Sequence, residues 1–282
     1  MKKLLKLSLS TANPFKMLLK MLFLFAVMTN TACKDSRISN TETQYSIVLI
    51  VGQSNTHAGI GLDPELDGSV DGISQLGRFG NDDMQIIRAE EPLQHHTKDD
   101  NKIGFGLTFA KLLKEYLDYP NQIIIIPCGF GGTGFQGNHW NKGDHLYSDA
   151  IKRVRTVIDN IPGSELTSIL WHQGESDVGS LSYETDLDNF ILNLRSDLDA
   201  NDTPFIVGGM VPFWVDQAIE RIEQQQIIMN VLNRHENIGY ANPELPFRIE
   251  KPDNFIDAIH YDAAGQRELG KRYFSEYYSL VN

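Results

Sequence analysis

Short apolar runs alternate with amphipathic helical stretches along most of this 282-residue chain, and this alternation limits the folds it can adopt. Residues 46–51 are mostly aliphatic and β-branched and end at Gly52, which predicts a strand buried on both faces. Further strands are predicted at residues 122–127, 166–171, 205–207 and 238–241, and helices at residues 107–117, 147–160, 183–198, 218–233 and 263–277. This order favours one α/β domain, with helices on both faces of a central parallel sheet in three layers.

Polar or glycine-rich segments follow three of the predicted strands, and a fourth precedes the last helix. They are residues 52–55 (Gly-Gln-Ser-Asn), 128–133 (Cys-Gly-Phe-Gly-Gly-Thr), 172–177 (His-Gln-Gly-Glu-Ser-Asp) and 257–260 (Asp-Ala-Ile-His). Ligands of open α/β sheets bind beyond the carboxyl ends of the strands, so these segments are expected to form one site. Residues 59–96 lack periodicity and are expected to be a long irregular segment beside that site.

The side chains in these segments are those of an acyl-transfer enzyme. Ser54 is the candidate nucleophile, and a serine hydroxyl needs a base within hydrogen-bond reach. His260 is the candidate base, because imidazole titrates near neutral pH and can return the proton to the leaving group. Asp257, three residues earlier, is predicted to orient the imidazole and to stabilise its protonated form.

Three donors are predicted to stabilise the oxyanion: the backbone N–H of Ser54, a glycine N–H of the Gly131–Gly132 turn, with Gly131 as the first candidate, and the side-chain amide of Gln173. Loss of one such donor typically raises the barrier by about 2.7–4 kcal/mol. Five more residues are predicted to support the site or to contact the substrate: Gln53, Asn55, Gly132, Glu175 and Asp177. For Glu175 and Asp177 an acid–base pair is the alternative to a supporting role.

The four segments resemble those of the SGNH hydrolases, and more closely the sialate O-acetylesterase-like branch that contains carbohydrate esterase family 6. That branch typically reads G-Q-S-N-M-x-G, then G-G-T with a following Trp, then Q-G-E-x-D, then D-x-x-H. This chain reads G-Q-S-N-T-H-A-G at residues 52–59, G-G-T at residues 131–133 with Trp140, Q-G-E-S-D at residues 173–177, and D-A-I-H at residues 257–260. The resemblance extends from about Ile47 to Tyr273.

The resemblance implies a flavodoxin-like α/β/α fold and a metal- and cofactor-independent serine esterase. Its substrates would be O-acetylated oligo- or polysaccharides, acetylxylan-like or sialate-like, cleaved through an acetyl-enzyme. Thr56 replaces the usual Met, and Gln94 stands where plant-like members tend to have His, which leaves the substrate preference in doubt. A lipase or thioesterase on the same scaffold is one alternative. A non-catalytic glycan-binding lipoprotein is another, although it would be expected to lack one of the three triad residues.

Several other residues permit two interpretations. His57 is expected to be a solvent-facing loop histidine rather than a substrate contact. The aromatic side chains of Phe135, Trp140 and Trp214 fit either stacking on sugar rings or packing in the core.

The first 33 residues are expected to be a bacterial export signal. Lys2, Lys3 and Lys6 precede an apolar run at residues 21–28, which is too short to span a bilayer. The segment ends in Asn-Thr-Ala-Cys33, which resembles a lipobox except for its Asn, and a plain signal peptide is the alternative. The predicted organisation is a signal at residues 1–33, a polar tether at 34–44 and the esterase domain at 45–282. The protein would then be membrane-anchored through lipid on Cys33, in the periplasm or on the cell surface.

Composition excludes other functions. The formal net charge is −12, and such a field repels phosphates, so nucleic-acid binding is not expected. With Cys33 and Cys128 as the only cysteines, no disulfide framework is expected whether or not Cys33 carries lipid. The eight histidines show no metal-ligand spacing. Neither a metal ion nor another cofactor is therefore predicted, and the sequence does not indicate an oligomeric state.

Overall fold

The computed structural model describes residues 44–117, 120–254 and 257–282. The predicted signal at residues 1–33 and nearly all of the predicted tether lie outside the described residues. No helix in the described ranges is both long enough and apolar enough to cross a membrane.

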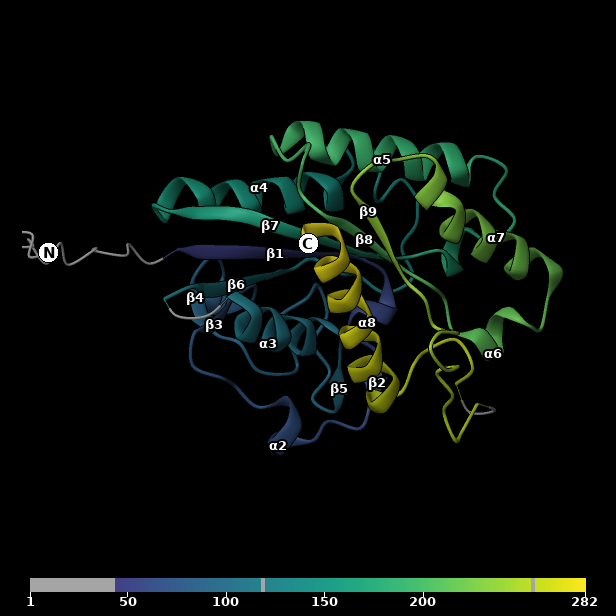
Figure 1. Ribbon diagram of the computed structural model, residues 1–282, viewed down its shortest axis with the longest axis horizontal. Coiled ribbons are helices and arrows are strands. Elements are labelled where there is room, and N and C mark those ends of the chain that lie inside the picture. Colours follow the sequence, from purple (N-terminus) through teal and green to yellow (C-terminus); the bar gives the residue numbers. More distant parts are fainter. Residues whose placement is uncertain (1–43, 118–119, 255–256) are drawn as a thin grey trace, which may run out of the picture. The chain divides into compact units, whose positions relative to one another are not determined.

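A central sheet of seven strands, in the order β4-β3-β6-β1-β7-β8-β9, forms the middle layer of the described chain (Figure 1). Its strands are β1 (Tyr45–Gly52), β3 (Ile73–Leu76), β4 (Ile86–Arg88), β6 (Gln122–Pro127), β7 (Ser164–His172), β8 (Phe205–Gly208) and β9 (Ile238–Ala241). All neighbouring pairs are parallel except β3 with β4. Two short strands, β2 (Gly59–Ile60) and β5 (Lys102–Ile103), pair separately.

The five strands predicted from the sequence occupy the order β6-β1-β7-β8-β9. Numbered along the chain, this is the 2-1-3-4-5 order of flavodoxin-like sheets. The chain reverses its direction across the sheet between β1 and β7, where the register pairs Gly52 with His172. The predicted α/β/α fold is thus confirmed, and the switch point lies where Ser54 and the segment after β7 meet.

Helices cover both faces of the sheet (Figure 1). On one face lie α4 (His145–Asn160), α5 (Tyr183–Asp197) and α7 (Ile219–Met229), and on the other lie α3 (Gly106–Leu117) and α8 (Ala263–Val281). Strand β1 serves both cores: Ile47, Leu49 and Val51 pack on the first face, whereas Val48 and Ile50 pack on the second. All five side chains are fully buried, and burying each stabilises the fold by about 1.5–3 kcal/mol.

The prediction of an irregular segment at residues 59–96 was wrong in part. This stretch contains β3 and β4, which extend the sheet beyond β6, and the short helix α2 (Pro64–Asp67). Neither strand is longer than four residues, and β3 reads Ile-Ser-Gln-Leu. Strands this short contain too few residues for an apolar run or an alternating pattern to be recognised. Another short helix, α6 (Pro212–Val215), was missed for the same reason.

Gly52 brings the ends of β1 and β7 together. Its φ angle is +129°, and a Cβ atom built there would lie 2.1 Å from the carbonyl oxygen of His172. The next residue, Gln53, donates its backbone N–H to that same oxygen at 2.8 Å. Only glycine combines this backbone angle with so close an approach, so Gly52 sets the point at which the chain leaves the sheet toward Ser54.

Replacing Gly52 by alanine should destabilise the fold in two ways, through its positive φ angle and through the clash of the new Cβ atom with His172. Gly143 is the matched control, because its φ is +93° and a Cβ atom there would meet nothing within 4 Å. We expect Gly143→Ala to cost about 1–2 kcal/mol of unfolding free energy, and Gly52→Ala to cost roughly twice that or more. Urea unfolding followed by circular dichroism measures both. Equal losses would show that the contact with His172 does not require glycine.

Candidate active site

The nucleophile turn follows β1 directly. Ser54 begins a single turn of 3-10 helix, η1 (Ser54–Thr56), whose next two residues are buried. Thr56 closes the turn by donating its Oγ1 hydrogen to the carbonyl oxygen of Gln53 at 2.7 Å. Because the turn is held by its own hydrogen bonds and by β7, the half-buried Ser54 side chain stands at the carboxyl edge of the sheet.

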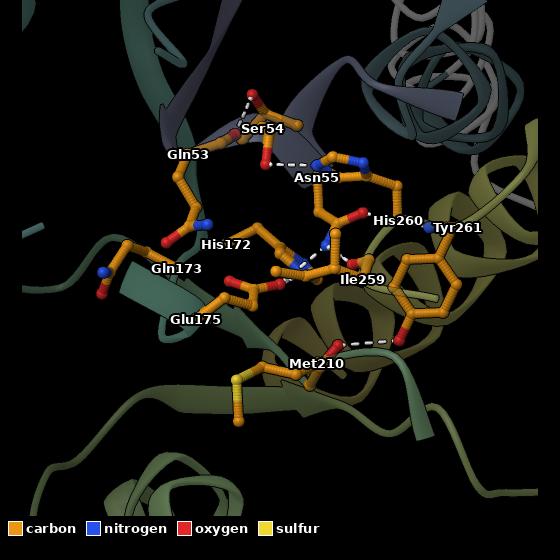
Figure 2. A network of polar contacts seen from close by, with 12 residues as sticks. Gln53, Ser54, Asn55, His172, Gln173, Glu175, Met210, Ile259, His260 and Tyr261 are labelled. Carbon is orange, nitrogen blue, oxygen red and sulfur yellow. Dashed lines mark hydrogen bonds and ion pairs between the residues drawn. The ribbon is translucent and has the colours of Figure 1, made fainter. Parts of the chain in front are cut away.

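Ser54, His260 and Asp257 form a continuous hydrogen-bonded chain. The Oγ atom of Ser54 lies 2.8 Å from Nε2 of His260 (Figure 2). Nδ1 of the same ring lies 2.8 Å from Oδ2 of Asp257. The other oxygen of Asp257 accepts the backbone N–H of His260 at 3.2 Å. The structure thus brings together the three residues predicted as a triad, although they span 206 positions of the chain.

The carboxylate of Asp257 is suited to orient the ring in its ionised form. Partial burial opposes ionisation, but the hydrogen bond from His260 and the positive charges of His260 and Lys251 outweigh it and lower the pKa of Asp257. An ionised Asp257 accepts a hydrogen bond from Nδ1, which leaves Nε2 free to accept the Ser54 proton.

Gly131 lies beside Ser54, as predicted. A Cβ atom built on Gly131 would be 3.6 Å from the Cβ atom of Ser54. Neither residue's backbone N–H donates to an acceptor within the described ranges. Gly132 follows with a φ of +72° and an exposed backbone, so the glycine turn remains open on the solvent side. Two backbone donors are therefore available next to the nucleophile.

Gln173 is placed differently from the predicted third oxyanion donor. Its side chain is fully buried, and its Nε2 donates to Oδ2 of Asp177 at 2.9 Å and to the carbonyl oxygen of Thr133 at 3.3 Å. Both N–H bonds of the amide are thus engaged. The bond to the carboxylate of Asp177 is the stronger of the two, because an ionised acceptor binds more tightly than a carbonyl oxygen. A role for Gln173 at the oxyanion would require the longer of these bonds to break, so that role stays a prediction.

The segment after β7 supports both neighbouring turns. Asp177 accepts the backbone N–H groups of Phe135 at 2.8 Å and Gln136 at 3.1 Å, which fixes the segment that follows the Gly131–Gly132 turn. The backbone N–H of Ser176 donates to Oε1 of Gln53 at 3.1 Å and so holds the nucleophile turn. These contacts fit the supporting role predicted for Asp177 and Gln53 and not acid–base chemistry by Asp177.

Glu175 and Asn55 lie beneath the triad. Oε1 of Glu175 accepts a hydrogen bond from Nδ2 of Asn55 at 2.7 Å, and Asn55 is fully buried. Burial raises the pKa of Glu175 and lowers the pKa of the neighbouring His172 to about 3. Burial thus shifts both side chains toward their neutral forms, and the ring of His172 is uncharged at neutral pH. Asn55, being inaccessible, supports the site and does not contact substrate.

The prediction that His57 faces solvent was wrong. Its side chain is buried, with Nδ1 2.8 Å from Oγ1 of Thr56, Nε2 2.7 Å from Oγ1 of Thr97, and its ring stacked on His95. Thr56 already gives its hydroxyl hydrogen to Gln53, so Nδ1 of His57 must donate and Nε2 must accept. Burial lowers the pKa of His57 to about 4, which keeps the ring neutral. The hydroxyl of Thr97, forty residues away, gave no signal in the sequence.

The aromatic candidates are divided between the core and its edge. Trp140 and Phe135 are buried and pack near Trp171 and Phe190, so they belong to the core. Trp214 is only partly buried, and the guanidinium group of Arg221 lies 4.0 Å from the centre of its ring.

Two residues with structural roles at the site were not predicted. Lys251 donates its Nζ hydrogen to the carbonyl oxygen of His260 at 2.8 Å, and Gln266 of α8 donates to the carbonyl oxygen of Asn55 at 2.9 Å. Gln266 is fully buried, although glutamine is usually exposed, and no motif in the sequence indicated this position.

Comparison with known proteins gives two relatives by sequence. A protein of Arabidopsis thaliana named as a probable carbohydrate esterase is 37% identical over 132 residues. These residues make up 44% of this chain and 49% of the plant protein, so the match spans about half of that relative. A protein of Escherichia coli (strain K12) named as a probable 9-O-acetyl-N-acetylneuraminic acid deacetylase is 23% identical over 67% of this chain and 76% of its own length.

Solved structures share the fold. The crystal structure of NanS superposes with a TM-score of 0.73 at 20% identity and covers 84% of this chain and 98% of its own. The X-ray structure of the Arabidopsis thaliana protein gives a TM-score of 0.67 at 27% identity and covers 83% of this chain and 98% of its own. A family model described as carbohydrate esterase, sialic acid-specific acetylesterase, matches residues 44–279. Since this match extends over nearly all of the described residues, the chain belongs to the carbohydrate esterase family of sialic acid-specific acetylesterases.

Proposed function

We propose that this protein is a serine esterase that removes O-acetyl groups from carbohydrates through an acetyl-enzyme. The observation that carries the proposal is the chain of two 2.8 Å contacts from Ser54 through His260 to Asp257. It lies at the carboxyl edge of β1 in a member of a carbohydrate esterase family. Nucleophile, base and orienting acid are the parts that ester hydrolysis without a cofactor requires.

Acylation uses all three residues. The Oγ atom of Ser54 attacks the acetyl carbonyl carbon while Nε2 of His260 takes the hydroxyl proton, and Asp257 stabilises the resulting imidazolium. In this mechanism the N–H groups of Ser54 and Gly131 donate to the oxyanion of the tetrahedral intermediate. As the intermediate collapses, the C–O bond to the sugar breaks, and the imidazolium protonates the departing sugar oxygen. The acetyl group remains esterified to Ser54.

Deacylation repeats the same steps with water. His260 removes a proton from a water molecule, which attacks the acetyl carbonyl of acetyl-Ser54, and the same donors stabilise the second oxyanion. Collapse breaks the bond to Oγ, returns the proton to Ser54 and releases acetate. The proton transfer between Ser54 and His260 joins groups already within hydrogen-bond distance, so this step needs little rearrangement of the resting geometry.

The substrate class follows from the family and its members. The family description and the name of the Escherichia coli relative support O-acetylated sialic acids, whereas the name of the plant relative supports carbohydrate esters in general. We expect acetate release from O-acetylated sialic acid and from acetylated xylo-oligosaccharides to exceed hydrolysis of long-chain esters. Enzymatic measurement of acetate over such a panel identifies the preferred substrate.

A lipase or thioesterase on this scaffold would need an apolar surface for a long acyl chain next to Ser54. The structure brings polar and glycine backbone to that position, namely the exposed Gly132 and the exposed Ser176, whose N–H is bonded to Gln53. Preference for octanoyl over acetyl esters of p-nitrophenol would support the alternative. A non-catalytic glycan-binding protein would not need the Ser54–His260 contact at all.

Removing the nucleophile should abolish the reaction without affecting the fold. We expect Ser54→Ala to lower kcat/KM for p-nitrophenyl acetate by at least about 10³-fold, because acylation has no other route. A serine-directed phosphonate should label the wild-type protein at Ser54 only. Ser279→Ala, an exposed serine on α8, is the control and should retain full activity and labelling. Near-normal turnover by Ser54→Ala would contradict the proposal.

The base and its orienting acid should differ in importance. His260→Ala should retain almost no activity, whereas Asp257→Asn should retain measurable activity that rises with pH, because Lys251 also holds the histidine loop. Rates of p-nitrophenyl acetate hydrolysis between pH 6 and 10 test this. Equal and complete loss in both variants would make the carboxylate indispensable. Full activity of Asp257→Asn would point to Asp253, because the side chain of Asp262 caps α8.

We also propose that residues 1–33 direct export in a bacterium and that Cys33 carries a lipid anchor, on the strength of the lysine-rich start, the short apolar run and the Ala-Cys ending. Metabolic labelling with palmitate during bacterial expression of the full chain should mark the wild-type protein in the membrane fraction. Cys33→Ser should lose the label, whereas Cys128→Ala, which removes the other cysteine, should keep it. Label retained on Cys33→Ser would exclude this anchor.

A further inference from the structure

Asn55 makes three side-chain hydrogen bonds directly behind the nucleophile. Its Nδ2 donates to Oε1 of Glu175 at 2.7 Å and to the carbonyl oxygen of Ile259 at 2.9 Å. Its Oδ1 accepts the backbone N–H of Tyr261 at 3.1 Å (Figure 2). The side chain has no exposed surface, so these partners occupy it fully and leave no contact with substrate.

Two of these bonds are made with the residues on either side of His260. Asn55 donates to the carbonyl oxygen of Ile259 and accepts the backbone N–H of Tyr261. With both flanking peptide groups held, the backbone of His260 cannot shift relative to η1 without breaking a buried hydrogen bond. In the described part of the chain, Asn55 and the Ser54–His260 contact provide the side-chain bonds that join the nucleophile turn to this loop.

Two backbone partners determine which way the amide of Asn55 faces. The carbonyl oxygen of Ile259 can only accept and the N–H of Tyr261 can only donate, so the NH₂ end lies toward Ile259 and Glu175 and the oxygen end toward Tyr261. The backbone of Asn55 is held independently, because Gln266 of α8 donates to its carbonyl oxygen. Asn55 is therefore held through its backbone by Gln266 and through its side chain by Glu175, in addition to its bonds with the histidine loop.

We infer that Asn55 is the positioning residue for the catalytic base: it sets the distance between Ser54 and His260 by tying the histidine loop to the nucleophile turn. The inference rests on the proposed esterase function and assigns Asn55 no contact with substrate. Proton transfer depends steeply on geometry, and a misplacement of about 1 Å can cost on the order of 10²-fold in rate. A residue that acts in this way changes kcat and leaves substrate binding nearly unaffected.

The test begins with Asn55→Ala assayed on p-nitrophenyl acetate. We expect kcat to fall about 100-fold and KM to change less than about threefold. The rate of Ser54 labelling by a serine-directed phosphonate should fall in parallel, which does not depend on knowing the natural substrate. Gln75→Ala is the matched control: this buried amide on β3 also bonds to backbone groups, at Arg88 and Gln94. It should lower stability without lowering kcat comparably.

A double-mutant cycle separates positioning from general loss of structure. In a His260→Ala background, Asn55→Ala should cause no further loss of the residual rate, because the group it positions is absent. The same loss in both backgrounds, or normal kcat in the single variant, would overturn the inference. If Asn55→Ala does not fold, the isosteric Asn55→Asp replaces it. That variant keeps the acceptor for Tyr261 but loses the donor to Ile259, so wild-type kcat in folded Asn55→Asp would equally overturn the inference.

Failure of the underlying function would look different. In that case Ser54→Ala and His260→Ala would themselves retain activity, whatever Asn55→Ala does. If both triad variants are inactive while Asn55→Ala is fully active, the esterase function stands and only the positioning role is lost.

Discussion

The parallel pairing of β1 with β6 on one side and β7 on the other is the constraint from which the site follows. Parallel strands end at the same edge, so the residues after β1, β6 and β7 emerge side by side. The ends of β1 and β7 approach each other closely at the carbonyl oxygen of His172. This oxygen accepts the N–H of Gln53 and leaves no room for a side chain on Gly52. A slip of one residue between β1 and β7 would turn Ser54 away from Gly131 and from the segment that supports it.

The sequence predicts those strands and motifs that a local pattern of residues defines. It does not predict positions that are set by contacts with residues far away in the chain. The apolar runs of β6 and β9 are recognisable to the residue, whereas β3 is too short and polar to be recognised and owes its place to pairing with β6. Ser54 could be predicted because it directly follows a buried strand, and Asp257 and His260 because their D-x-x-H spacing precedes the last helix and resembles a family motif. The orientation of Gln173 could not, since Asp177 and Thr133 compete for its amide. The same holds for His57, whose buried ring is bonded to the distant Thr97.

Burial and neighbouring charges shift the pKa values of the ionisable groups around the site in different directions. His57 and His172 have lowered pKa values and Glu175 a raised one, in each case because removal from water disfavours the charged form. Asp257, by contrast, is held ionised by His260 and Lys251 although it is partly buried. Near the imidazole, then, the neighbouring histidines are uncharged and the bonded carboxylate is charged. The imidazolium formed during acyl transfer therefore meets an attractive charge and little repulsion from these histidines.

The two halves of the triad are supported in different ways. Ser54 follows the central strand β1 and is positioned by it. His260 and Asp257 belong to a loop before α8, and side-chain hydrogen bonds from Lys251 and Asn55 hold this loop in place. The side chains of His260 and Asp257 remain 26% and 31% exposed, so a bulky sugar can reach them without a large movement of the chain. An open triad of this kind cannot rely on a closed pocket to place its base. Buried hydrogen bonds must therefore position the base, and Asn55 makes them from the same turn that carries the nucleophile.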